Sequence, residues 1–304
     1  MTGSEFAARA EGLKSLPFPE IPDTVPGGDM PGDVIKINEG HIAKAKVILS
    51  RLSGLLEQAS EKSDKVVISV FGGSGVGKSE IASLLGFCLE SAGIGSYVLS
   101  GDNYPRRIPL YNDAERASVF RAAGLKGLVN AGLYSEEVKS ELLLLWDNET
   151  DPDPKLKSEY PWLAVYQDCG RKALSDYLGT SREQDYDEIN AIIRNFKAGK
   201  DLIYLKRMGR TENERWYSQI NFTDINVLII EWTHGGNAAL EGIDIPILLN
   251  STPEETKEHR RLRARDGKTD SAFTTMVLEI EQAELDSRAH TALIRISKAG
   301  ELMT

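Results

Sequence analysis

The sequence has only two cysteines in 304 residues, Cys88 and Cys169, and they lie far apart. A disulfide framework or a zinc site of paired cysteines therefore cannot be built, which fits a reducing compartment. No apolar run reaches the roughly 20 residues that cross a bilayer, and residues 1–20 lack the apolar segment of a secretory signal. We expect a cytoplasmic protein without a membrane partner.

Basic residues are also outnumbered, with 36 Lys and Arg against 46 Asp and Glu, a net charge of -10. Such a charge repels the phosphate backbone of DNA and RNA, so we expect no nucleic-acid partner. The four histidines show no metal-ligand spacing, and no Gly-x-Ser-x-Gly segment is present. A metalloprotease or serine hydrolase function therefore finds no support in the sequence. The oligomeric state stays open, and a homodimer is compatible with the sequence.

Residues 17–33 are dense in Pro, Gly and acids, so residues 1–33 are expected to form an extended N-terminal arm. An amphipathic helix is predicted within residues 34–60. Buried strands are predicted at Lys65–Phe71, Tyr97–Ser100, Leu202–Leu205, Val227–Glu231, Ile245–Leu249 and Ala292–Ile296, with helices at Ser79–Ala92 and Pro253–Arg265 between some of them.

Alternating strands and helices predict an α/β fold of three layers, a P-loop type with a mostly parallel five-stranded sheet and helices on both faces. Residues 105–183 depart from this alternation, because they contain apparent helices, an acidic Pro-rich segment and an aromatic segment. We expect them to be an inserted, mainly helical, acceptor-binding subdomain. The core would then comprise residues 34–104 and 184–304.

One motif carries a definite chemistry, a glycine-rich loop between a predicted strand and a predicted helix. It reads Gly72, Gly73, Ser74, Gly75, Val76, Gly77, Lys78, Ser79 and fits G-x-x-x-x-G-K-[ST]. Its backbone N–H groups would surround phosphate oxygens at the start of a helix. Lys78 would reach the β- and γ-phosphates, and the Ser79 hydroxyl would face Mg²⁺.

Two acids follow predicted strands near this loop. Glu231 ends the strand NVLIIE and is the candidate magnesium ligand, although a strand-terminal Glu can also simply face solvent. Asp102 follows the strand YVLS and could orient and deprotonate a substrate hydroxyl, or alternatively cap a turn. The strand ending at Leu249 is followed by Asn250-Ser251-Thr252-Pro253 rather than the Asn-Lys-x-Asp base reader of GTP-binding switches, so ATP is the expected nucleotide.

These motifs together resemble the phosphoribulokinase/uridine kinase family of P-loop small-molecule kinases. The resemblance rests on GGSGVGKS, LSGDNY, LIIE and RRLRARD, and covers about residues 65–104 and 184–298. It implies that Asp102 is the catalytic base with Tyr104 beside it, and that Glu231 is the glutamate closing the later strand. The chain departs from the family at Trp232, where the family has Gly, and in the length of the inserted segment.

The resemblance also implies a lid helix carrying Arg261 and Arg265 and a β-hairpin at LIYLKRMGR, whose Arg207 would touch the acceptor. Four-residue spacing places the two lid arginines on one helix face, which would meet charge on the transferring phosphoryl group. A solvated basic face is the alternative. Arg106 and Arg107 follow the Asp102 segment and favour an anionic acceptor.

In the inserted segment, Tyr160, Trp162 and Tyr166 would form an acceptor pocket or, alternatively, the segment's own core. The sequence therefore predicts an ATP- and Mg²⁺-dependent kinase acting on a hydroxyl of a sugar, sugar phosphate, nucleoside or hydroxy acid. The alternative is a P-loop switch or assembly protein whose inserted segment binds a protein.

Overall fold

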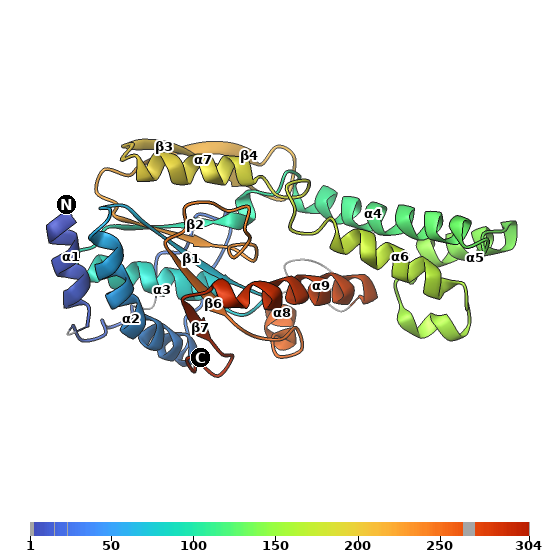
Figure 1. Cartoon of the computed structure of the whole chain (residues 1–304), viewed down its shortest axis with the longest axis horizontal. Helices are drawn as coiled ribbons and strands as arrows, with labels where there is room; N and C mark the ends of the chain where they lie inside the picture. Colours follow the sequence, from blue (N-terminus) through green and yellow to red (C-terminus); the bar gives the residue numbers. More distant parts are fainter. Residues whose placement is uncertain (1–2, 15, 23, 264–270, 304) are drawn as a thin grey trace.

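The computed structural model describes residues 3–14, 16–22, 24–263 and 271–303. Its centre is a parallel five-stranded sheet in the order β2-β5-β1-β6-β7, which confirms the expected α/β fold (Figure 1). The strands are β1 (Val66–Gly72), β2 (Ser96–Ser100), β5 (Val227–Glu231), β6 (Ile245–Leu249) and β7 (Ile294–Ile296). β5 lies between β1 and β2, so the order of the strands across the sheet changes direction at this point, although all strands are parallel. In α/β sheets a crevice for ligands forms at the carboxyl ends of the strands at such a point.

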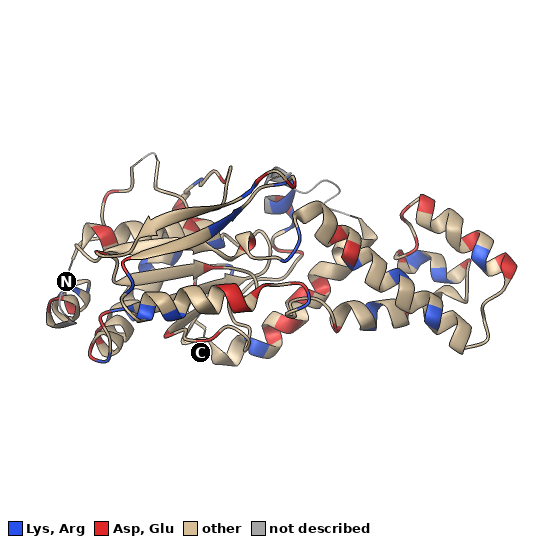
Figure 2. Cartoon of the chain, turned by 90° about the horizontal axis from the view of Figure 1, so that it is seen from above, with Lys and Arg blue, Asp and Glu red and all other residues tan. Residues whose placement is uncertain are grey.

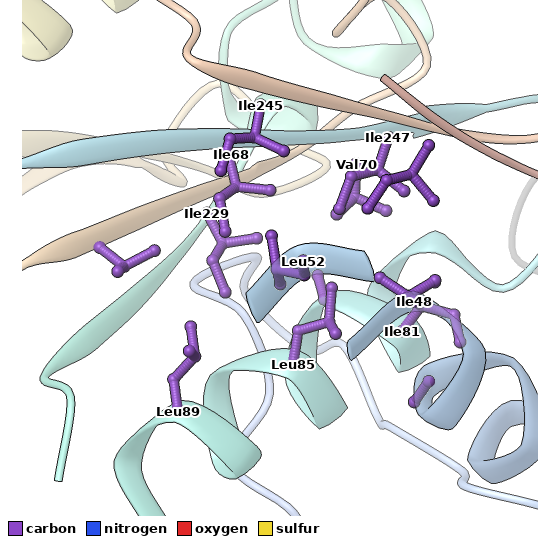
Figure 3. Packing of buried hydrophobic residues seen from close by; sticks show 14 of the residues in the cluster. Ile48, Leu52, Ile68, Val70, Ile81, Leu85, Leu89, Ile229, Ile245 and Ile247 are labelled. Atoms are coloured by element: carbon purple, nitrogen blue, oxygen red, sulfur yellow. The ribbon is translucent and has the colours of Figure 1, made fainter. Parts of the chain in front are cut away.

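Helices α2 (Glu39–Ser60) and α3 (Lys78–Ser91) cover one face of the sheet. Alternate strand residues such as Ile68 and Ile229 pack against Ile48 of α2 and Leu85 of α3 (Figure 3). Asn38 caps α2 by accepting a hydrogen bond from the His41 N–H at 2.9 Å. This packing fixes the start of α3, and with it the phosphate-binding loop.

The opposite face of the sheet is covered by α7 (Tyr186–Lys197) and an antiparallel hairpin of β3 (Leu202–Met208) and β4 (Arg215–Asn221). The predicted strand at 202–205 therefore belongs to the hairpin that the family resemblance implies at LIYLKRMGR, and not to the parallel sheet. Its side chains alternate between buried and exposed, with Ile203 buried and Tyr204 exposed, as in a strand that covers a core with one face only.

Between β2 and α7 the chain forms three helices that extend away from the sheet (Figure 1): α4 (Pro109–Asn130), α5 (Glu136–Asp147) and α6 (Leu163–Ser175). We call residues 105–183, which contain them, the insert. Acidic and basic residues are interspersed along its helices (Figure 2). The insert's buried cluster includes Phe120 and Tyr166 and continues into α9 (Ala272–Arg288), which follows α8 (Lys257–Arg263). Short 3-10 turns occur at Gly101–Asn103, Pro154–Ser158 and Ala289–Thr291.

The N-terminal arm differs from its expected extended form. Residues Gly3–Gly12 form helix α1, because Phe6 and Ala10 lie four apart and bury one face against the core beside α2. The described residues between α1 and α2 lack regular secondary structure, and Gly28 and Asp29 among them lie against β2. Among the described residues, no helix is long and apolar enough to span a bilayer.

Candidate active site

The glycine-rich loop connects β1 to α3 as the sequence predicts. Gly77 precedes α3 with φ of 98°, a left-handed conformation that favours glycine. The Lys78 ammonium donates a hydrogen bond to the Gly73 carbonyl at 3.1 Å, so it lies over the loop. The loop N–H groups and the amino end of α3 therefore surround a space suited to phosphate oxygens.

Glu231 lies at the carboxyl end of β5, in register with Val70 of β1 and Ser100 of β2. Its carboxylate accepts a hydrogen bond from the Ser100 hydroxyl at 2.7 Å and a longer one from the Ser79 hydroxyl at 3.4 Å. Burial, together with the negative charge of Asp102, raises the pKa of Glu231 to about 8, against the opposing effects of Lys78 and Ser100.

These groups fit Mg²⁺, because a buried carboxylate beside the Ser79 hydroxyl offers hard oxygen ligands. No group of three or more His, Cys, Asp or Glu that could hold a metal ion occurs among the described residues. Mg²⁺ in proteins is commonly held by one or two carboxylates together with substrate phosphates.

Asp102 is exposed in the 3-10 turn that follows β2, and its charge reaches Glu231. The turn packs tightly, since a Cβ on Gly101 would lie 2.0 Å from Cγ of Trp232. Trp232, which stands where the resembled family has Gly, is thus accommodated by a glycine on the neighbouring strand end. The carboxyl ends of β2 and β5 remain adjacent, as the site requires.

A cavity of about 980 Å³ brings these residues together. Lys78, Ser79, Asp102 and Glu231 line it, along with Ser74, Gly75, Gly77 and Ser100. The rest of the wall comes from the N-terminal arm, the insert, the β3–β4 hairpin, α8 and α9. The cavity therefore joins the phosphate-binding loop to a second region large enough for a small acceptor.

On the side of the insert, Arg116 of α4 forms the centre of a charged group. Its guanidinium lies 2.6 Å from a Glu183 carboxylate oxygen, and 3.6 Å from oxygens of Glu281 on α9 and Asp113. Burial raises the pKa of Glu281 to about 7, although Arg116 opposes the rise. This group connects the insert to α9 at the cavity wall.

A second charged pair of the wall lies further along the insert. Asp151 is fully buried, binds the Arg121 guanidinium at 2.9 Å and accepts a hydrogen bond from the Tyr166 hydroxyl at 2.8 Å. Three aromatic rings also line the cavity, those of Phe120, Phe273 and Trp216. Trp216 is 45% exposed, so part of its side chain is accessible to a ligand.

Three residues predicted to contact substrate are buried away from the cavity. Tyr104 is turned inward by the 3-10 turn and packs in the core beneath the hairpin. Tyr166 belongs to the insert's core, which confirms the alternative role of that aromatic. Arg207 is held by an ion pair with Asp29 at 2.8 Å. We correct these assignments because the three side chains do not line the described cavity wall.

Arg106 and Arg107 are likewise engaged elsewhere. Arg106 forms ion pairs with Asp185 and Asp187, and Arg107 contacts Glu115 and donates a hydrogen bond to the Tyr177 hydroxyl. Neither arginine lines the described cavity wall, so the two residues give no reason to expect an anionic acceptor.

The arginine of α8 that lines the cavity is not one of the two that the sequence predicts. Arg261 is exposed on α8 and is absent from the described wall, and Arg265 lies outside the described residues. Instead Arg260 lines the cavity, where its Cγ approaches Gly75 of the loop. A change of one position on a short helix turns a side chain by about 100°, which explains the difference.

Sequence reasoning missed Arg116, Arg121, Glu281 and Trp216. None belongs to a local motif, and each reaches the cavity only through the packing of the insert, α9 and the hairpin. One indirect signal was present in the sequence. The acidic, Pro-rich segment contains Asp151, the partner of Arg121, and a buried acid needs a partner in the folded chain.

The strand order, the loop after β1 and the glutamate that closes β5 define a P-loop protein of the α/β class. No family model matches the chain. It is 35% identical over 239 residues, 79% of its length, to the bifunctional alpha-galactosidase/sucrose kinase AgaSK of Mediterraneibacter gnavus, and spans 21% of that relative. A kinase activity is thus part of the name of the relative that this chain resembles.

Two solved structures show lower similarity. One, assigned as a fructose transport system kinase from Silicibacter sp. TM1040, has a TM-score of 0.45 and 13% identity, with 84% of this chain and 95% of that chain covered. The other, assigned as a uridine kinase from Bacillus stearothermophilus, has a TM-score of 0.34 and 17% identity, with 76% and 88% covered.

Proposed function

We propose that the protein is an ATP-dependent kinase that transfers the γ-phosphoryl group to a hydroxyl of a neutral sugar. The main support for this proposal is that Lys78, Asp102 and Glu231 line the same cavity as residues of the insert. The sucrose kinase activity in the name of the curated relative supports the choice of a sugar.

The charge of the wall supports a neutral acceptor. Its carboxylates are Asp33, Asp102, Asp113, Glu149, Asp151, Glu214, Glu231 and Glu281, and its cations are Lys78, Arg116, Arg121, Arg210 and Arg260. Acids thus outnumber cations by eight to five, and by six to five when Glu231 and Glu281, whose pKa values are raised to about 8 and about 7, carry a proton. Arg116 and Arg121 are already paired with acids. Carboxylates and paired guanidinium groups suit sugar hydroxyls, which both donate and accept hydrogen bonds, whereas a second phosphate would meet net negative charge.

In the proposed reaction, Asp102 orients the acceptor hydroxyl and takes its proton. The hydroxyl oxygen forms a bond to the γ-phosphorus while the bond from that phosphorus to the β,γ-bridging oxygen breaks, and ADP leaves with the electron pair. Lys78 and Arg260 stabilise the charge on the phosphoryl oxygens. Ser79 and Glu231 would hold Mg²⁺, which would neutralise charge between the β- and γ-phosphates.

The test is an acceptor panel with purified protein and MgATP. Sucrose, fructose, glucose, uridine and fructose 6-phosphate are supplied separately, and ADP release and the mass of the product are measured. A neutral sugar that gains one phosphoryl group supports the proposal. Phosphorylation of uridine or fructose 6-phosphate alone would overturn the neutral-sugar assignment, and ADP release without any phosphorylated product would favour the nucleotide-driven switch.

A further inference from the structure

The segment between α1 and α2 contributes to the cavity although it belongs to the N-terminal arm. Met30, Pro31, Gly32 and Asp33 line the cavity wall. The segment reaches this position by running close to β2, where Gly28 lies against Val98. β2 is an edge strand, so its outer backbone groups need partners from outside the sheet.

Asp29 supplies such a partner, and its side chain is only 6% exposed. One carboxylate oxygen accepts hydrogen bonds from the Ser100 N–H at 2.7 Å and from the Asn103 side-chain amide at 3.1 Å. The other pairs with Arg207 at 2.8 Å and accepts from the Tyr97 hydroxyl at 3.1 Å.

These contacts hold the chain on both sides of Asp102, since Ser100 is two residues before it and Asn103 follows it directly. Asn103 is also held by the hairpin, since its side-chain oxygen Oδ1 accepts a hydrogen bond from the Met208 N–H at 2.9 Å. The buried carboxylate of Asp29 therefore links the N-terminal arm to the end of β2 and to the hairpin, next to the proposed base. A general base must lie within hydrogen-bond reach of its proton, so holding this turn in place matters for the reaction.

We propose that Asp29 is a positioning residue that holds the Asp102 turn in its reactive place, and that the arm is thereby part of the active site. This inference rests on the proposed kinase function for its catalytic consequence. Asp29 itself contacts the turn and the hairpin, whereas Lys78, the proposed phosphate ligand, belongs to the start of α3. Loss of the Asp29 side chain should therefore lower kcat and leave nucleotide binding intact.

The test compares Asp29→Ala with Asp244→Ala, a matched control. Asp244 also accepts a hydrogen bond from a strand N–H, that of Val67 at 2.8 Å, and pairs with Lys197 at 2.7 Å, but at the amino end of β1. Both variants should lose thermal stability. Only Asp29→Ala should lower kcat for the sugar, by roughly 10- to 100-fold, the scale of a misplaced catalytic group, with MgADP affinity unchanged.

A second readout does not depend on activity. Deuterium uptake at the backbone amides of residues 100–104 should rise in Asp29→Ala and stay unchanged in Asp244→Ala. The milder Asp29→Asn keeps an acceptor for Ser100 and serves if the alanine variant does not fold. Unchanged uptake in this segment, or wild-type kcat in an active enzyme, overturns the inference. A wild-type protein that phosphorylates no sugar refutes the proposed function, while the uptake comparison still decides whether Asp29 holds the turn.

Discussion

A single carboxylate, Asp102, separates a kinase from a P-loop protein that only binds its nucleotide. Asp102→Asn keeps the size of the side chain and an oxygen for turn hydrogen bonds, but removes the charge that would take the proton of the acceptor. Sugar phosphorylation should fall by about 10²-fold or more, the usual scale for a positioned general base. MgATP should still bind in calorimetry. A variant that phosphorylates sugar at the wild-type rate would show that Asp102 serves only the turn.

The raised pKa of Glu231 gives a prediction about stability. The pKa is about 8 in the folded chain and near the ordinary 4.5 in the unfolded chain, so folding disfavours the ionised form. Without Mg²⁺, the free energy of unfolding should therefore decrease as pH rises from about 4.5 to about 8. Glu231→Gln should remove this decrease, so its Tm should exceed that of the wild type at pH 8 in EDTA.

The same substitution should have the opposite effect on function, because an amide binds Mg²⁺ more weakly than a carboxylate. Glu231→Gln should need more Mg²⁺ for half-maximal kinase activity. If its Mg²⁺ titration matches that of the wild type, another acid holds the metal. If its Tm at pH 8 is no higher, the carboxylate is not penalised by burial.

At the residue scale, the sequence predicts what local motifs determine. Lys78, Ser79 and Glu231 lie at the cavity because a strand, a loop and a helix fix them within a few residues of chain. Arg116 and Glu281 could not be found in this way, since their meeting depends on how α4 packs beside α9. Tyr104 misled the prediction because a 3-10 turn rotates it into the core.

Among the elements, the β3–β4 hairpin presents the exposed aromatic residue at the cavity, Trp216. An indole ring can stack on the C–H face of a sugar while neighbouring polar groups bind its hydroxyls. Trp216→Ala should therefore raise KM for the sugar several-fold, with KM for ATP unchanged, and Trp216→Phe should retain most of the affinity. Tyr204→Ala is the control, because Tyr204 is also exposed on the hairpin but does not line the described wall. Equal KM values in both alanine variants would place the sugar elsewhere.

Element prediction succeeds where burial on both faces leaves a continuous apolar run, as in β5 and β6, whose observed bounds equal the predicted ones. It fails for α1, because only Phe6 and Ala10 mark the buried face of a short helix next to a Pro-rich segment. The apolar run alone does not separate β3 from the parallel sheet, since a short run does not reveal its partner strand, whereas the family resemblance implies the hairpin that is observed.

For the whole molecule, α9 is the element that joins the insert to the sheet. Met276, Val277 and Ile280 pack in the insert's cluster, whereas Leu285, further along the helix, packs with Phe71 and Leu248 of the sheet. The insert's helical character was predictable from the sequence pattern, but this connection was not, because α9 begins about 90 residues after the insert ends. The acceptor side of the cavity should therefore depend on how α9 holds the insert.

Ile280→Ala tests that dependence. Ile280 is 4% exposed in the insert's cluster, and losing its buried methyl and methylene groups should cost about 2–5 kcal/mol of stability. Because it loosens the contact of α9 with the insert, KM for the sugar should rise while MgADP affinity stays constant. Leu128→Ala is the matched control, since Leu128 is buried in the same cluster near the far end of α4 and should lower Tm without changing KM for the sugar. If both variants raise KM equally, general loosening of the insert is responsible, and if neither does, α9 does not set the shape of the acceptor pocket.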